Sequence, residues 1–298
     1  MNGIVNVNKP LGITSHDVVY RLRRILNIKK IGHTGTLDPD AAGVLPMCVG
    51  KGTKLAELLT GADKQYLAEL TLGAITDTQD ASGEILERFD VNVCEEDIIR
   101  AIQSFVGEIE QIPPMYSAVK IDGKKLYELA REGKTVERKS RRVTILNIEV
   151  RNIDLKNNTV EMLIDCSKGT YIRTLCEDIG KTLGCGGYMS KLTRTRSGRF
   201  KLEDAYDLET IEQMAMSGNF DFLTPVENAM PEYPKAILAE RNAKKVRNGI
   251  KISVQGLDIG ETYRVFDEQG EFLVIAKQGE EHLEILKTFY DGSAGACK

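Results

Sequence analysis

Near the N-terminus the hydrophobic residues change from a spacing of two to the spacing of a helix. Residues 4–8 alternate between apolar and polar side chains, which predicts a short strand that stops at the turn-forming run 9–12. Thr14 can then cap a helix, with Asp17 three residues on to bond back to the cap. Apolar side chains follow on one helical face, at Val18, Val19, Leu22, Ile25 and Leu26.

The same two spacings predict a mixture of strands and helices along the rest of the chain. Strands are expected at 44–49, 66–72, 117–121, 142–154, 159–166 and 188–195, and helices at 54–59, 95–105, 124–132, 170–183 and 208–216. The runs 142–154 and 159–166 flank a Lys-Asn-Asn turn and should form a hairpin. Glycine and proline interrupt residues 32–43, which we interpret as a loop.

The order of these elements indicates the fold class and two domains. Strands and helices follow one another without the regular rhythm of parallel α/β folds, which favours an α+β protein with a mixed, largely antiparallel sheet and flanking helices. From about residue 231, one short helix at 239–248 precedes strands punctuated by glycine. We therefore expect a large domain over residues 1–230 and a small β-rich domain over residues 231–298.

Composition narrows the class of protein. With 298 residues, 42% of them hydrophobic and 28% charged, the chain can form a folded core, which excludes collagen-like, low-complexity and disordered classes. No apolar run approaches about 18 residues and the N-terminus lacks the apolar stretch of a signal peptide, so we expect a soluble, cytoplasmic protein without a membrane segment. The six cysteines contain no CxxC pair, and four lie beside apolar or small residues, as buried thiols do. With only three histidines, no metal site is expected.

The charge is unevenly distributed, although the net charge is only −4. Lys and Arg exceed the acids by five in residues 1–54, by five in 120–142 and by six in 181–201, whereas residues 202–232 carry eight acids and no base. A polyanion meets a local patch rather than the sum, because charges are screened within about 8–10 Å at physiological salt. The basic blocks leave two interpretations open, solvated faces or an RNA or DNA partner.

The densest group of chemically useful residues lies in segment 30–46, where His33, Asp38 and Asp40 fall among glycines and prolines. Three interpretations compete. Asp38 could cap a turn before Pro39, the glycines could present backbone N–H groups to a phosphate, or Asp38 could be a carboxylate nucleophile beside Asp40. The last would suit a magnesium-dependent hydrolase similar to the haloacid dehalogenase phosphatases. No Gly-Lys-Ser/Thr follows, which excludes a P-loop.

This segment also carries a resemblance to a known family. Gly-His-Thr-Gly-Thr-Leu-Asp-Pro at 32–39, followed by Ala-Gly-Val-Leu-Pro at 42–46, resembles the catalytic motif of the TruB family, the tRNA pseudouridine synthases that isomerise the T-loop uridine at position 55. Four further segments are similar to motifs of that family, residues 8–17, 63–66, 167–175 and 192–198. The resemblance covers roughly residues 3–230 and implies a pseudouridine-synthase-like fold, a tRNA substrate and a reaction without cofactor or metal.

The resemblance implies roles for particular residues. Asp38 corresponds to the catalytic aspartate and Arg173 to the arginine whose charge keeps that carboxylate ionised. Tyr66 is implied to stack on the target uracil and to accept a proton. Three more residues are implied to contact the flipped nucleotide: His33, Tyr171 and Leu192. The family pattern differs at Asp40, a second carboxylate that we expect to point to solvent.

Beyond the site, the resemblance implies a role for the basic blocks. Residues 120–142 fall where the family carries an RNA-gripping insertion, and residues 181–201 would follow the phosphate backbone beside the site. The small C-terminal domain is similar to PUA-type RNA-binding domains, with its basic helix 239–248 as the expected contact. The implied partner is the T-arm of tRNA, and nothing in the sequence requires more than a monomer. The alternative is a non-catalytic RNA-binding or tRNA-folding protein on the same scaffold.

Overall fold

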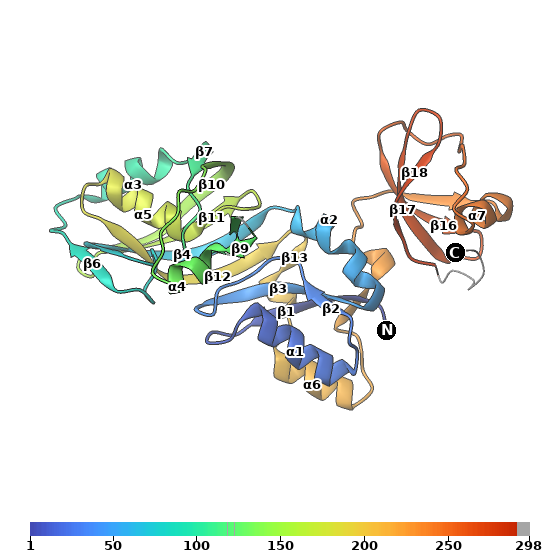
Figure 1. Cartoon of the computed structure of the whole chain (residues 1–298), viewed down its shortest axis with the longest axis horizontal. Helices are drawn as coiled ribbons and strands as arrows, with labels where there is room; N and C mark the ends of the chain where they lie inside the picture. The colour runs from blue at the N-terminus through green and yellow to red at the C-terminus, as the bar shows by residue number, and fades with distance from the viewer. Residues whose placement is uncertain (118, 122, 291–298) are drawn as a thin grey trace.

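The computed structural model describes residues 1–117, 119–121 and 123–290 of the chain. It contains a large ten-stranded sheet and, towards the C-terminus, a separate four-stranded sheet at one end of the molecule (Figure 1). The seven described α-helices are α1 (Ser15–Leu26), α2 (Ala56–Thr60), α3 (Glu95–Gln103), α4 (Leu126–Arg131), α5 (Ile172–Thr182), α6 (Leu208–Met216) and α7 (Glu240–Arg247). Short 3-10 helices are η1 (Gly50–Leu55), η2 (Leu202–Asp204) and η3 (Val226–Asn228).

The large sheet is mixed and largely antiparallel, as the sequence predicts. Its strand order is β14 (Leu223–Pro225), β1 (Gly3–Lys9), β3 (Ala41–Val49), β12 (Gly187–Ser197), β4 (Lys64–Leu72), β11 (Thr159–Cys166), β10 (Arg141–Asp154) and β7 (Gly107–Gln111). Strand β2 (Ile31–His33) pairs with β3, and β13 (Phe200–Lys201) pairs with β12. Among the described pairs of this sheet, only β3 and β12 run parallel.

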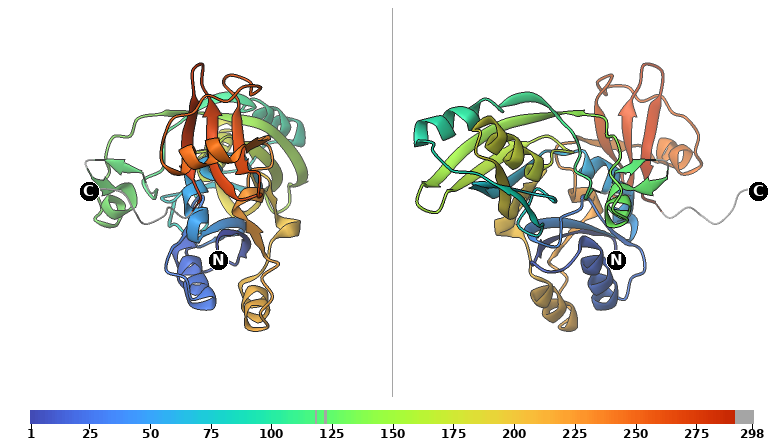
Figure 2. Two further views of the ribbon diagram at one scale, coloured as in Figure 1. Left: turned by 90° about the vertical axis from the view of Figure 1, so that its right-hand side faces the viewer. Right: turned by 60° about the vertical axis from the view of Figure 1, so that its left-hand side comes forward.

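Smaller sheets complete the structure. The C-terminal sheet has the order β15 (Lys235–Leu238), β16 (Thr262–Asp267), β17 (Phe272–Gln278) and β18 (Leu283–Thr288). Two hairpins stand apart, β5 (Ala74–Thr76) with β6 (Ile85–Arg88), and β8 (Lys120–Ile121) with β9 (Lys124–Lys125). The left view of Figure 2 shows the segment with β8, β9 and α4 projecting sideways from the large sheet. The α+β class is therefore confirmed.

The first helix forms as its sequence predicts. Thr14 accepts from the backbone N–H of Asp17, and the Asp17 carboxylate accepts from that of Thr14, which completes a capping box. The helix buries Val18, Val19 and Leu22 against the sheet. It also contacts α6, whose bounds agree with the predicted 208–216. These helices hold the N-terminal half of the sheet as a rigid support.

The hydrophobic core is divided into three clusters of buried side chains. One lies between the large sheet and its helices, and another lies within the four-stranded sheet around α7. The third brings Ile4 and Leu55 of the N-terminal half together with Ile275 of the C-terminal sheet and Phe289, the residue after β18. The C-terminal sheet thus has its own core and also packs against β1 and η1. A domain boundary near residue 231 stays a prediction.

Several local expectations need correction. The predicted loop 32–43 is shorter, because β2 extends to His33 and β3 begins at Ala41. The expected strand 117–121 is reduced to β8, and its Ala118 lies outside the described residues. Four described cysteines are buried and free, as expected, and Cys94 is exposed. The remaining cysteine, Cys297, lies outside the described residues.

The parallel contact between β3 and β12 depends on a glycine. Gly43 lies opposite Arg194 with a φ of 103°, and a side chain there would overlap the backbone of Arg194. We expect Gly43→Ala to lower the free energy of unfolding by about 2 kcal/mol in urea titrations, since both strain and overlap oppose it. Gly32→Ala is the matched control, because open space surrounds that position. Equal stability of the two variants would contradict this account.

Candidate active site

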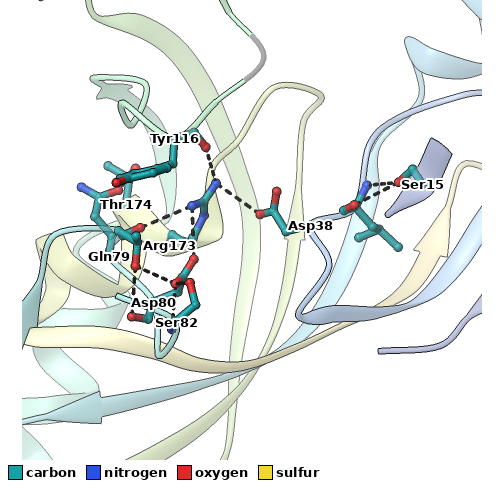
Figure 3. A network of polar contacts seen from close by, with 10 residues as sticks. Ser15, Asp38, Gln79, Asp80, Ser82, Tyr116, Arg173 and Thr174 are labelled. Atoms are coloured by element: carbon teal, nitrogen blue, oxygen red, sulfur yellow. Dashed lines mark hydrogen bonds and ion pairs between the residues drawn. The ribbon is translucent and has the colours of Figure 1, made fainter. Parts of the chain in front are cut away.

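Asp38 lies in the loop between β2 and β3, residues 34–40, which we call the Asp38 loop. The hydroxyl of Ser15 accepts from the Leu37 backbone N–H at 2.8 Å and donates to the Leu37 carbonyl at 2.9 Å (Figure 3). The backbone N–H of Gly12 donates to the Pro39 carbonyl at 2.8 Å. Residues on both sides of Asp38 are therefore fixed to the N-terminus of α1 and to the turn before it.

A buried lysine supports the same loop. Lys9 is fully buried, and its ammonium donates to the carbonyls of Pro10, Ile13 and Pro39 at 2.8, 2.7 and 3.3 Å. Burial lowers the pKa of Lys9 to about 8, although the nearby Asp38 carboxylate opposes this shift. Lys9 was counted in the basic block 1–54, but its ammonium is buried beneath the Asp38 loop and does not reach solvent.

Arg173 gathers three separate segments around one guanidinium group. Its Nη2 lies 3.2 Å from Asp38 Oδ2 and donates to the Tyr116 carbonyl at 3.0 Å. Its Nη1 lies 3.2 Å from Asp80 Oδ2 and donates to the Thr78 carbonyl at 3.3 Å (Figure 3). The arginine side chain is only 8% exposed. The expected contact between Asp38 and Arg173 is therefore present in the structure.

Asp80 is a member of this network that the sequence analysis did not single out. It is buried, and its Oδ1 accepts from the hydroxyls of Thr78 and Ser82 at 2.7 and 2.6 Å. Beside it, Gln79 accepts a hydrogen bond from the hydroxyl of Thr174 on α5. The signal in the sequence is the polar run Thr-Asp-Thr-Gln-Asp-Ala-Ser at 76–82, which is typical of a turn with side-chain hydrogen bonds.

The environment of Asp38 sets its charge state. Burial raises the pKa of the Asp38 carboxyl, the Arg173 guanidinium opposes this shift, and the Asp80 carboxylate adds to it. The Asp38 side chain is nevertheless 44% exposed, so one side of the carboxylate faces the surroundings while the other faces Arg173. Asp40 is exposed, as expected. This arrangement suits a carboxylate that must meet a substrate.

Tyr66 lies on β4 directly opposite Arg194 of β12, in the middle of the sheet. Burial raises the pKa of Tyr66, and the charge of Arg194 opposes the shift. Arg194 is itself buried, with its Nε donating to the Val44 carbonyl at 2.7 Å and its Nη2 to the Gly35 carbonyl at 3.2 Å. Arg194 was expected to follow a phosphate backbone with the rest of block 181–201; instead it holds β3 and the Asp38 loop.

The remaining candidate residues surround this centre. His33 ends β2, where burial and the charge of Arg194 lower its pKa, and its Nδ1 is buried without a hydrogen-bond partner among the described residues. Tyr171 is the residue before α5, two positions from Arg173. Leu192 lies in β12 opposite Ala41, the first residue of β3, and is nearly buried. Within the described part of the chain, no three His, Cys, Asp or Glu side chains form a cluster that could hold a metal ion.

Comparison with known proteins places this chain in one family. Residues 23–172 match the TruB family pseudouridylate synthase N-terminal domain, and residues 173–230 match the tRNA pseudouridylate synthase B C-terminal domain. The chain belongs to the TruB family of pseudouridylate synthases. It is 45% identical over 291 residues to the tRNA pseudouridine synthase B of Clostridium novyi, covering 96% of this chain and 99% of that protein.

Further relatives agree with this assignment. The tRNA pseudouridine synthase B of Alkaliphilus oremlandii is 52% identical over 252 residues, covering 85% of this chain and 83% of that protein. Among solved structures, a Cbf5-Nop10-Gar1 complex contains a chain that is similar with a TM-score of 0.74 and 29% identity, covering 97% of this chain and 85% of that one. The expected pseudouridine-synthase-like fold of the large sheet is thereby confirmed.

The ion pair with Arg173 should be measurable through the titration of Asp38. In Arg173→Gln the opposing positive charge is removed, so the pKa of the Asp38 carboxyl should rise above its wild-type value. Carbon-detected NMR of labelled aspartate carboxyls measures this directly. Arg196→Gln is the control, because Arg196 pairs with Asp165 instead. An unchanged Asp38 titration in folded Arg173→Gln would refute the assigned pairing.

Proposed function

We propose that this protein converts uridine to pseudouridine at position 55 in the T-loop of tRNA. The observation that carries the proposal is the half-exposed Asp38 carboxylate paired with buried Arg173, in a chain of the TruB family. The tRNA substrate is the one in the names of its relatives. No helix in the described residues is long and apolar enough to cross a membrane. We place the reaction in the cytoplasm, with the protein acting as a monomer.

The reaction moves one glycosidic bond within a nucleotide. The bond between ribose C1′ and uracil N1 breaks, the base turns, and a bond between C1′ and C5 forms, while the C5 hydrogen leaves as a proton and N1 takes up a proton. Asp38 acts as the nucleophile, toward either the ribose or the uracil ring, and Arg173 keeps it ionised. Because the product is an isomer of the substrate, the reaction needs no external oxidant or reductant. It is proposed to proceed without a cofactor or metal.

The target base must leave the stack before Asp38 can reach it. Tyr66, which lies opposite Arg194 in the sheet, is assigned to stack on the uracil and to accept the C5 proton. Its raised pKa keeps it a neutral phenol, so its oxygen gives up its own proton as it takes the new one. Tyr171 and Leu192 are assigned to line the pocket, and His33 to contact the flipped nucleotide. The orphan Nδ1 of His33 supports this role, since a buried polar atom without a partner can take one from a ligand.

Isotope release tests the proposed reaction. In EDTA, wild type should release tritium from tRNA labelled at C5 of uridine, whereas Asp38→Asn should release none above background, because an amide cannot act as the nucleophile. Asp40→Asn is the matched control, with an exposed carboxylate nearby, and should retain release.

The outcomes separate the competing functions. Binding of tRNA without tritium release by wild type would leave only the RNA-folding alternative. Equal release by wild type and Asp38→Asn would remove Asp38 from the reaction. Tritium release by wild type in EDTA would remove the magnesium-dependent hydrolase alternative.

Electrostatic binding of tRNA should depend on the basic insertion, residues 112–140 together with Arg141 and Arg142 at its base. Seven exposed bases lie there: Lys120, Lys124, Arg131, Lys134, Lys139, Arg141 and Arg142. Each phosphate that is neutralised adds about 0.7–0.9 to the slope of log Kd against log salt. We expect Lys120→Ala and Lys139→Ala to reduce that slope and Arg151→Ala, an exposed base on β10, to leave it unchanged. A flat plot for wild type would contradict the proposal.

A further inference from the structure

Gln111 joins the basic insertion to the helix that carries Arg173. It is the last residue of β7 and is 1% exposed. Its Nε2 donates to the Tyr171 carbonyl at 3.2 Å, and its Oε1 accepts from the Tyr171 backbone N–H at 3.0 Å. A neutral amide can donate and accept at once, so one side chain satisfies both backbone groups of Tyr171.

The two hydrogen bonds between Gln111 and Tyr171, which we call the clamp, act on Arg173 through the start of α5. Tyr171 is the residue before α5, and Arg173 is the second residue of the helix. The orientation of the first turn of α5 determines where the Arg173 guanidinium can reach. Removal of the clamp would leave the Tyr171 N–H without its partner, while the Tyr171 carbonyl would keep only the bond from the Leu175 N–H. The unpaired N–H favours a shift of that first turn.

The same segment reaches Arg173 from its other side. Five residues after Gln111, the Tyr116 carbonyl accepts from Arg173 Nη2, the nitrogen that also pairs with Asp38 (Figure 3). The chain between them contains Pro113 and Pro114, whose fixed φ angles make it stiff. These prolines therefore fix the reach from Gln111 to the Tyr116 carbonyl.

The segment that leaves the sheet after Gln111 and the segment that returns to it at Arg141 lie side by side. Arg141, where the chain returns to the sheet, lies opposite Gln111 in the β7–β10 pair. Arg138 on the returning arm donates to the Pro113 carbonyl at 3.2 Å. The insertion thus has a single base, and that base is hydrogen-bonded to the start of α5.

We propose that Gln111 is a positioning residue that makes the geometry of Arg173, and hence of Asp38, depend on where the basic insertion lies. The inference rests on the proposed function. When RNA phosphates attract the insertion, Tyr116 presses its carbonyl against Arg173 while Gln111 keeps the first turn of α5 in place. The guanidinium is then held against Asp38 when RNA is bound.

The test measures the single-turnover rate and the Kd of two glutamine variants with full-length tRNA and compares them with wild type. Gln111→Met removes both hydrogen bonds with little change of shape. Gln103→Met, on α3, removes a single bond to the Ile148 carbonyl of β10 and none to Tyr171 or Arg173. We expect Gln111→Met to lower the single-turnover rate about 10- to 100-fold, as small misplacements of reacting groups do, with an unchanged Kd. Gln103→Met should match wild type in both. If Gln111→Met does not fold, Gln111→Glu, which keeps only the acceptor, should show a smaller loss.

The same substitution made in an Asp80→Asn protein distinguishes a positioning role of Gln111 from a general structural role. In Asp80→Asn, where Arg173 has already lost one anchor, Gln111→Met should have far less effect than in wild type, since both act through the same guanidinium. An equal loss in both backgrounds, an effect on Kd instead of rate, or a wild-type rate in Gln111→Met would overturn the inference. Absence of pseudouridine formation by wild type would instead defeat the proposed function.

Discussion

The site depends on one buried positive charge. The Arg173 guanidinium is almost completely removed from water, which carries a large cost unless its donors find acceptors. Two carboxylates and two carbonyls supply them, from the Asp38 loop, the 76–82 turn and the insertion. These segments are distant in the sequence, so the arginine is satisfied only when the fold has brought all three together. Assembly of the site and folding of its surroundings are thus the same event.

Further buried cations hold the opposite side of the Asp38 loop. Arg194 and Lys9 bond to main-chain carbonyls of the loop and its flanking strand, whereas Arg173 alone among the described residues is ion-paired to the Asp38 side chain. The backbone is fixed by groups that do not compete for the carboxylate. This division lets one face of Asp38 remain available to a substrate, although its loop is tightly anchored. The charge of Arg173 opposes the rise that burial causes in the pKa of the Asp38 carboxyl.

Local features were predictable where a short stretch of sequence determines them. The capping box of Thr14 and Asp17, the hairpin of β10 and β11 and the bounds of α6 all follow from neighbouring residues. Asp38 and Arg173 were found through family motifs. Asp80 was not, because its turn carries no motif in the sequence analysis and its partner Arg173 lies 93 residues away. Strand β7 was missed since it is a short strand with two glutamates, at the edge of the sheet.

The count of charges was informative about RNA binding only where the side chains reach solvent. Blocks 1–54 and 181–201 each contain a base that is buried beneath the site, Lys9 and Arg194, and these serve the loop instead of a polyanion. Block 120–142 has seven of its nine bases exposed, and it belongs to the insertion, whose Tyr116 carbonyl accepts from Arg173. Buried Lys9 and Arg194 hold the Asp38 loop, and under the proposed function the exposed bases attract the tRNA. The insertion is the element where the two sets meet, so under the proposed function binding energy from phosphates would act on the arginine that pairs with Asp38.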